Sequence, residues 1–218
     1  MGGEKMHHTN RLIIMRKQFV FLFFIVTSHL LAAGPLESLD AELRKAWPGN
    51  RAVNIVFHGH SVPAGYHVTP DVRPFESYPH LVHRELKRRY PHAVINVIVT
   101  AIGGENSASG AERFERDVLR HQPDLVLIDY ALNDRRLSIA EAEAAWGSMI
   151  RACEEAGIPV VLLTPTGDSR ADMSSADDPL RQRAELVRRL GREDGVMLGD
   201  VAAAWLGEIA AALRSPSC

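Results

Sequence analysis

The sequence predicts a three-layer α/β/α sandwich around a doubly wound, five-stranded parallel sheet. Short segments in which nearly every residue is apolar alternate with longer amphipathic segments. Strands of this kind are typical of parallel sheets that helices cover on both faces. The 218 residues are also enough for one domain with a full core, and no internal repeat or long linker divides them.

The apolar segments are short enough for buried strands, and the amphipathic segments are long enough for helices. The predicted strands lie at 52–57, 93–99, 125–130, 158–163 and 196–198. The predicted helices lie at 76–90, 109–121, 138–157, from the proline at 179 onward, and at 200–213.

Three of these helices have a recognisable start. Ser109 with Glu112 and Ser138 with Glu141 have the spacing of capping boxes. Asp178 stands directly before a proline, which favours a helix that begins with that proline in its first turn.

Three polar segments follow the first three strands, at the edge where ligands bind in doubly wound sheets. Ser61 lies in a glycine-containing turn after the first strand, where a serine is exposed as a nucleophile. Gly104 follows the second strand and Asn133 the third. The N–H groups of Ser61 and Gly104 and the amide of Asn133 would together form an oxyanion hole, which acyl transfer requires.

These segments resemble the three blocks of the SGNH (GDSL-type) hydrolase family. The blocks are Gly59-His60-Ser61, then 104–107, which reads Gly-Glu-Asn-Ser, and the pair Asn133-Asp134. The resemblance covers about residues 52–205 and implies a flavodoxin-like fold without metal or organic cofactor. It implies that Ser61 is the nucleophile, that Gly104 and Asn133 complete the oxyanion hole, and that the chain is similar to extracellular bacterial esterases of acylated carbohydrates or lipids.

The chain departs from the family pattern at three places. His60 stands where the family usually has aspartate, and Ala131 stands where it usually has glycine. The family's last block, Asp-x-x-His, is absent, and no histidine follows His121. We therefore expect a product truncated or frameshifted before that block, with little or no turnover because the base is missing. The alternative is a noncatalytic secreted relative that binds carbohydrate or acyl groups at a vestigial site.

Other histidines offer a substitute base only if they reach the serine hydroxyl. His58 and His60 flank the Ser61 turn, and neighbouring residues rarely align an imidazole with a serine Oγ, whereas His67 lies in the following loop and is freer. We expect His60 and His67 to shape the mouth of the pocket. Asp134 is a further pocket candidate, although we expect it mainly to stabilise the third loop.

Three rival sites fit the sequence less well. A metal pair at His58 and His60 would need further ligands from later strand ends, which offer no histidine. A Gly-x-Ser-x-Gly elbow is excluded because Pro63 replaces its second glycine and no helix is expected directly after the serine. The loop at 103–104 is not a P-loop, since no Lys-Ser/Thr follows it.

The N-terminus resembles a secretory signal. Arg16 and Lys17 precede an apolar run at 19–26, and small residues follow at 32–34. We expect residues 1–33 to be an N-terminal extension plus signal peptide, with the true start at Met15, and residues 34–218 to be the hydrolase-type domain. The domain would be secreted or periplasmic, and the alternative is a membrane anchor.

The net charge restricts the expected binding partners, and the cysteine content restricts the expected disulfides. The formal net charge of −2 gives no attraction to nucleic acid or anionic membrane, so the expected partner is a small-molecule or polysaccharide-linked ester. We expect no stable membrane span after processing, and nothing in the sequence sets the oligomeric state. Two cysteines are too few for a disulfide framework, and Cys153 is expected to be a small core residue.

Overall fold

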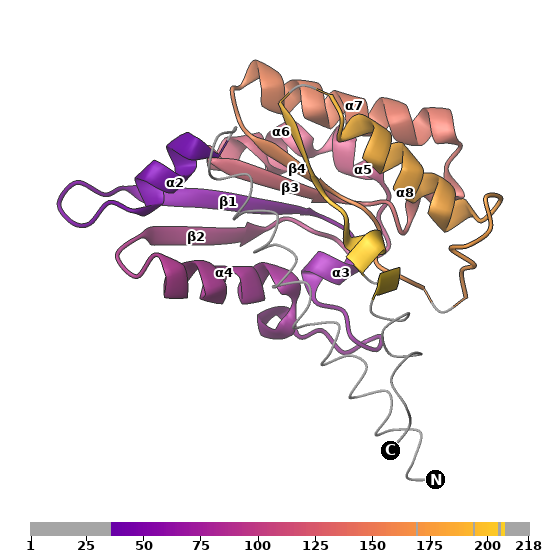
Figure 1. Ribbon diagram of the computed structural model, residues 1–218, viewed down its shortest axis with the longest axis horizontal. Helices are drawn as coiled ribbons and strands as arrows, with labels where there is room; N and C mark the ends of the chain where they lie inside the picture. Colours follow the sequence, from indigo (N-terminus) through magenta and orange to yellow (C-terminus); the bar gives the residue numbers. More distant parts are fainter. Residues whose placement is uncertain (1–35, 169, 194, 205, 208–218) are drawn as a thin grey trace, which may run out of the picture.

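The computed structural model describes residues 36–168, 170–193, 195–204 and 206–207. Its strands form one parallel sheet in the order β2-β1-β3-β4-β5, which confirms the predicted doubly wound sheet (Figure 1). The strands are β1 (Ala52–Gly59), β2 (Val94–Val99), β3 (Leu125–Asp129), β4 (Val160–Leu163) and β5 (Val196–Gly199).

Helices connect the strands. The α-helices are α2 (Glu37–Leu43), α3 (Ser61–Ala64), α4 (Tyr78–Arg89), α5 (Ser107–Glu112), α6 (Phe114–Asp117), α7 (Ile139–Glu155) and α8 (Pro179–Leu190). Short 3-10 turns lie at η1 (Pro74–Glu76), η2 (Leu119–His121) and η3 (Asp134–Arg136).

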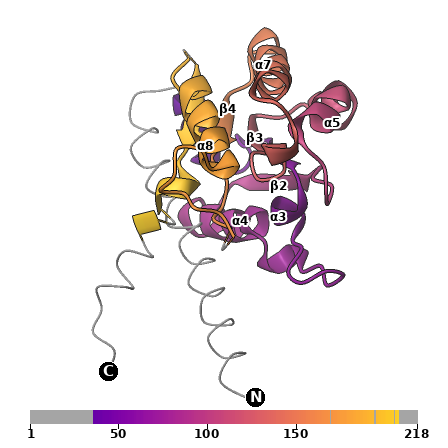
Figure 2. The same cartoon turned by 90° about the vertical axis from the view of Figure 1, so that its right-hand side faces the viewer.

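Two apolar clusters fill the space on the two faces of the sheet. One joins β1 and β3 to α2 and α4, and the other joins β3 and β4 to α6, α7 and α8. Figures 1 and 2 show α4 on one side of the sheet and α7 with α8 on the other. Because side chains alternate along a strand, nearly continuous apolar strands supply both clusters.

Most of the predicted element signals act as expected. Ser138 and Glu141 form the capping box of α7, and Asp178 caps α8 by accepting from the N–H groups of Leu180 and Arg181. Cys153 is completely buried on α7, as predicted for a core residue.

The segment 109–121 is not one helix, and its predicted start was wrong. The cap is Asn106, whose side chain accepts from the N–H of Ser109, so α5 begins two residues early. Arg113 leaves the helical conformation, with φ −108° and ψ 4°, and separates α5 from α6, and Val118 separates α6 from η2. The buried Arg113 side chain bonds Glu105 instead of lying along a continuous helix surface.

Two predicted segments extend beyond the described residues. Of the helix predicted at 200–213, residues 201–204 and 206–207 are helical, and the rest lies outside the described part. The expected extension and signal peptide at 1–33 also lie outside it. None of the helices within the described ranges has the length and apolar character needed to cross a bilayer.

Candidate active site

Ser61 is the first residue of α3, which follows β1 at the carboxyl edge of the sheet (Figure 1). The expectation that no helix directly follows the serine was wrong. Pro63 lies in the first turn of α3, where a missing N–H costs nothing, and Gly65 ends the helix with φ +93°. Gly59 permits this turn, since a Cβ there would lie 2.5 Å from the carbonyl oxygen of Asp129.

His60 is the N-cap of α3 and is buried, not at the mouth of a pocket as predicted. Its Nδ1 accepts from the N–H of Val62 at 3.3 Å and lies 3.4 Å from Ser61 Oγ. Its Nε2 lies 3.3 Å from Asp129 Oδ1, close enough for an ion pair but outside hydrogen-bond geometry. The parallel register pairs Gly59 with Asp129, which brings the next residue, His60, beside that carboxylate.

Asp129 is the last residue of β3 and is almost completely buried. Its Oδ2 accepts a hydrogen bond of 3.2 Å from the hydroxyl of Tyr78 on α4. Burial, together with the Asp129 carboxylate, raises the pKa of Tyr78 well above its usual value, so the tyrosine remains a neutral donor.

Gly104 lies in the loop after β2 with φ +85°, a conformation that favours glycine. A Cβ at this position would find nothing within 4 Å, so the residue faces open space. Neither its N–H nor that of Ser61 donates to another group in the described part of the chain. Two backbone donors at neighbouring strand ends are thus available to a ligand.

Asn133 ties the third loop to the second. Its Nδ2 donates to the carbonyl oxygen of Glu105 at 2.7 Å. An amide group carries two N–H donors, so the second remains for a ligand.

The other two predicted pocket residues have different surroundings. Asp134 is completely buried and accepts from the N–H of Ser107 at 2.8 Å and from Trp146 Nε1 at 2.7 Å. It therefore holds loops together, and burial raises its pKa. His67 is half-buried, and within the described residues its side chain makes no hydrogen bond to Ser61.

A buried polar network supports the loop that contains Gly104, and sequence reasoning missed it. Arg113 Nε donates to Glu105 Oε1 at 3.0 Å, and the hydroxyl of Tyr130 donates to Glu105 Oε2 at 3.3 Å. Glu105 and Arg113 are eight residues apart and on different elements, so no helical spacing indicates the pair.

His58, on β1, also belongs to this network. Its Nε2 contacts the carbonyl oxygen of Gly110 and the Tyr130 hydroxyl, both at 3.1 Å, and its Nδ1 contacts Thr100 Oγ1 at 2.8 Å. Burial lowers the pKa of His58 to about 4. The ring is therefore neutral near neutral pH, and both nitrogens are occupied.

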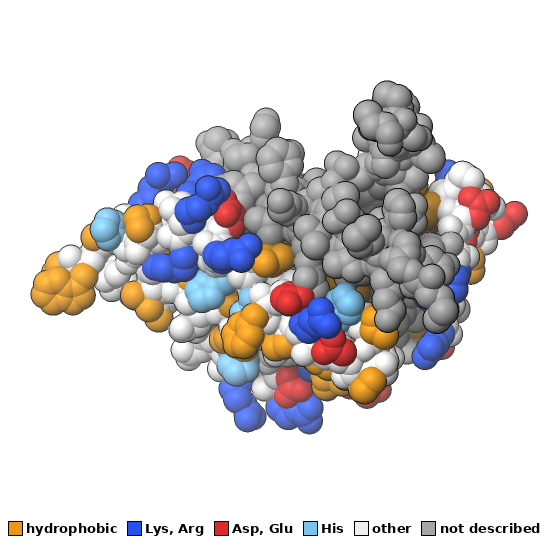
Figure 3. Space-filling model, turned by 90° about the horizontal axis from the view of Figure 1, so that it is seen from below, with side chains coloured by type: hydrophobic (Ala, Val, Ile, Leu, Met, Phe, Trp, Pro, Cys, Tyr) orange, Lys and Arg blue, Asp and Glu red, His pale blue; other side chains and the backbone are white. Residues whose placement is uncertain are grey.

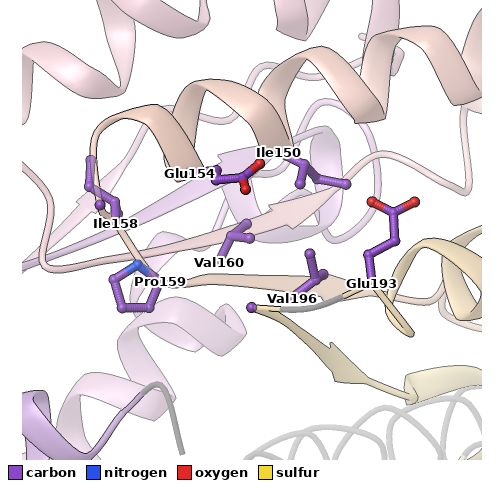
Figure 4. A pocket seen from close by; sticks show the side chains of 9 residues that line it. Ile150, Glu154, Ile158, Pro159, Val160, Glu193 and Val196 are labelled. Carbon is purple, nitrogen blue, oxygen red and sulfur yellow. The ribbon is translucent and has the colours of Figure 1, made fainter.

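A cavity of about 290 Å³ lies at the opposite edge of the sheet, lined by the end of α7 and the starts of β4 and β5 (Figure 4). Its walls include Ile150, Ile158 and Val196, with Glu154 and Glu193 at the rim. The cavity lies at the opposite edge of the sheet from Ser61, and no serine, cysteine or histidine lines it. We therefore place the candidate active site at the other edge.

On the face seen in Figure 3, Lys and Arg side chains gather on the left-hand part, and basic, acidic and hydrophobic side chains are interspersed over the centre. Within the described ranges, no group of three or more His, Cys, Asp or Glu residues is arranged to hold a metal ion.

Comparison with known proteins decides the family. The model of the GDSL-like lipase/acylhydrolase family matches residues 57–215. The chain belongs to this family. The resemblance predicted from the three blocks is thereby confirmed, and this GDSL-family chain is a hydrolase of ester bonds.

Solved structures share the fold. An acetyl xylan esterase, AlAXEase, superposes with a TM-score of 0.63 at 22% identity over 74% of this chain and 84% of that one. A lipase/acylhydrolase from Enterococcus faecalis gives 0.57 at 22% identity over 70% and 77%. An acetyl xylan esterase variant from Geobacillus stearothermophilus gives 0.60 at 21% identity over 72% and 80%. The search of curated protein sequences found no match.

Proposed function

We propose that this GDSL-family hydrolase cleaves carboxylic esters through an acyl intermediate on Ser61. The observation that carries the proposal is the position of Ser61 on the first turn of α3, at the same edge of the sheet as the uncommitted backbone N–H groups of Ser61 and Gly104. The N–H groups of Ser61 and Gly104 and the free amide hydrogen of Asn133 would stabilise the oxyanion.

The reaction proceeds in two steps. Ser61 Oγ attacks the acyl carbon, its proton moves to a base, and the alcohol leaves with a proton from that base. Water then attacks the acyl-serine and releases the acid. No histidine follows His121 in the sequence, so the base that the family resemblance implies in its last block is not among these residues, and we expect turnover of this chain to be impaired.

The proposed substrates are acylated carbohydrates or lipids, met outside the cytoplasm if residues 1–33 act as a signal peptide. Acetylated polysaccharide is the first class to test. Several proteins with the same fold are acetyl xylan esterases, and another is an esterase active on acetylated mannans.

The test compares initial rates of hydrolysis of p-nitrophenyl acetate and acetylated xylan by the wild-type chain and a Ser61→Ala variant. Ser148→Ala is the matched control, because among the described residues the Ser148 hydroxyl donates only to the carbonyl oxygen of Ala145 in its own helix. We expect slow hydrolysis that Ser61→Ala abolishes and Ser148→Ala leaves unchanged. Binding of acetylated xylan without turnover, unaltered by Ser61→Ala, would favour the noncatalytic alternative.

A further inference from the structure

Ser61, His60 and Asp129 form a row of hydroxyl, imidazole and carboxylate. The distances are 3.4 Å from Ser61 Oγ to His60 Nδ1 and 3.3 Å from His60 Nε2 to Asp129 Oδ1. The row depends on the register of two neighbouring strands, since the N–H of His60 also donates to the carbonyl oxygen of Asp129 at 3.2 Å.

The contacts of the His60 ring fix its tautomer. A backbone N–H is only a donor, so Nδ1 must accept from Val62 with its lone pair. In the neutral ring the proton is then on Nε2, which faces the Asp129 carboxylate. The single lone pair of Nδ1 faces both the Val62 N–H and the Ser61 hydroxyl, and the protonated Nε2 lies beside the carboxylate. A small rotation of the ring that improves both contacts would give the arrangement that a general base requires.

We propose that His60, oriented by Asp129, is the general base for Ser61, an inference that rests on the proposed role of Ser61 as nucleophile. The Oγ–H proton moves to Nδ1 as the Oγ–C bond forms and the carbonyl electron pair moves to oxygen. The intermediate then expels the alcohol, which takes the proton from Nδ1. Water repeats the sequence on the acyl-serine and restores both the hydroxyl and the neutral ring.

A buried carboxylate lies beside the ring of His60. The new imidazolium would lie against the Asp129 carboxylate, and both groups are almost completely excluded from water, which strengthens their attraction. Tyr78, on α4, is a further titratable group at this carboxylate, and its hydroxyl donates to Oδ2. The Val62 N–H loses its acceptor, but that bond of 3.3 Å is already long.

Two other histidines are less suited to this role. Both ring nitrogens of His58 are occupied by Thr100 and Gly110. His67 makes no side-chain bond to Ser61 in the described part of the chain. His60 also explains a departure from the family pattern, because an imidazole caps α3 as the expected aspartate would and adds a nitrogen that accepts a proton.

The first test does not require esterase activity. A Ser61→Cys variant is alkylated with iodoacetamide across a pH series, and the rate at residue 61 is followed by mass spectrometry of its peptide. If His60 takes the proton, a thiolate–imidazolium pair forms, and the midpoint falls to about pH 7 or below from about 8.5 for an ordinary thiol.

The matched variant adds His60→Asn, which still caps α3 but has no titrating nitrogen. We expect the midpoint to return to about 8.5, and Asp129→Asn to move it in the same direction. Circular dichroism checks that each variant is folded. An unchanged midpoint in the folded His60→Asn variant would overturn the proposal.

Ester hydrolysis separates this inference from the proposed function. In the chain that retains Ser61, we expect His60→Asn to lower the rate of ester hydrolysis by about 10²–10⁴-fold. If hydrolysis depends on Ser61 but survives His60→Asn, the base assignment fails and the proposed function stands. If the thiol midpoint shifts as expected but no ester is cleaved above the Ser61→Ala rate, the proton-accepting role stands and the proposed function fails.

Discussion

The side-chain amide of Asn133 donates a 2.7 Å hydrogen bond to the backbone carbonyl of Glu105, which joins the loop after β3 to the loop after β2. The same amide group has a second N–H donor, and the bond to Glu105 fixes the orientation of that donor. One residue thus holds the Gly104 loop in position and offers a donor at the same edge of the sheet. Its removal affects both.

Asn133→Ala should reduce ester hydrolysis strongly. Loss of one oxyanion donor costs about 10²–10³-fold in kcat, and the untied loop adds to that loss. Steady-state rates with p-nitrophenyl acetate provide the measurement. Asn96→Ala is the control, because within the described part of the chain the Asn96 side chain bonds only Asn54 on the neighbouring strand, at an exposed position. Equal rates in the two variants would contradict the role given to Asn133.

Gly104→Ala separates backbone strain from crowding. The added methyl group meets nothing within 4 Å, so the cost is strain at φ +85°, about 1 kcal/mol of unfolding free energy. Relief of that strain rotates the Gly104 N–H, and we expect kcat to fall at least about tenfold. Gly157→Ala is closely matched, with φ +67°, no contact and a position far from Ser61. Urea unfolding should give similar losses for both, and only Gly104→Ala should lower kcat.

The sheet was predictable because nearly all residues of its strands are apolar, a pattern that depends on local composition and not on partners. The capping box at Ser138 was predictable for the same reason, since both of its residues lie within one turn. The helix α2 was missed even though Leu36, Leu39 and Leu43 have helical spacing and are buried. Its seven residues are too few for a periodic pattern to be distinctive.

Of the candidate site, only the residues placed by the ends of the strands were predictable. Ser61, Gly104 and Asn133 lie at the ends of three strands that are adjacent in the sheet, as expected. The contact between His60 and Asp129 was not predictable, because it joins residues far apart in the chain through the register of β1 on β3. The broken helix at Arg113 has the same origin, since a distant buried partner outweighs local helix propensity.

Arg113→Met should destabilise the fold far more than a surface charge deletion. The Arg113 and Glu105 side chains are 8% and 17% exposed, and removing one partner leaves a mostly buried charge uncompensated. We expect a loss of about 3 kcal/mol in urea unfolding at neutral pH. Arg116→Met is the control, because Arg116 is 66% exposed in its pair with Asp117 and should cost less than about 1 kcal/mol. Similar losses for the two variants would contradict the importance of the buried pair.

His58 should make the fold sensitive to mild acid. Burial lowers its folded-state pKa to about 4, whereas the unfolded chain has the ordinary value of 6.5. Above 6.5 both states are neutral, so the folded state has its full stability. As the pH falls from 6.5 toward 4, the unfolded state binds a proton that the folded state does not, and stability declines by up to about 3 kcal/mol. Urea unfolding at a series of pH values measures this slope, and His58→Gln isolates the contribution of His58 from that of the carboxylates. A slope in His58→Gln as steep as in the wild type would show that another group causes the decline.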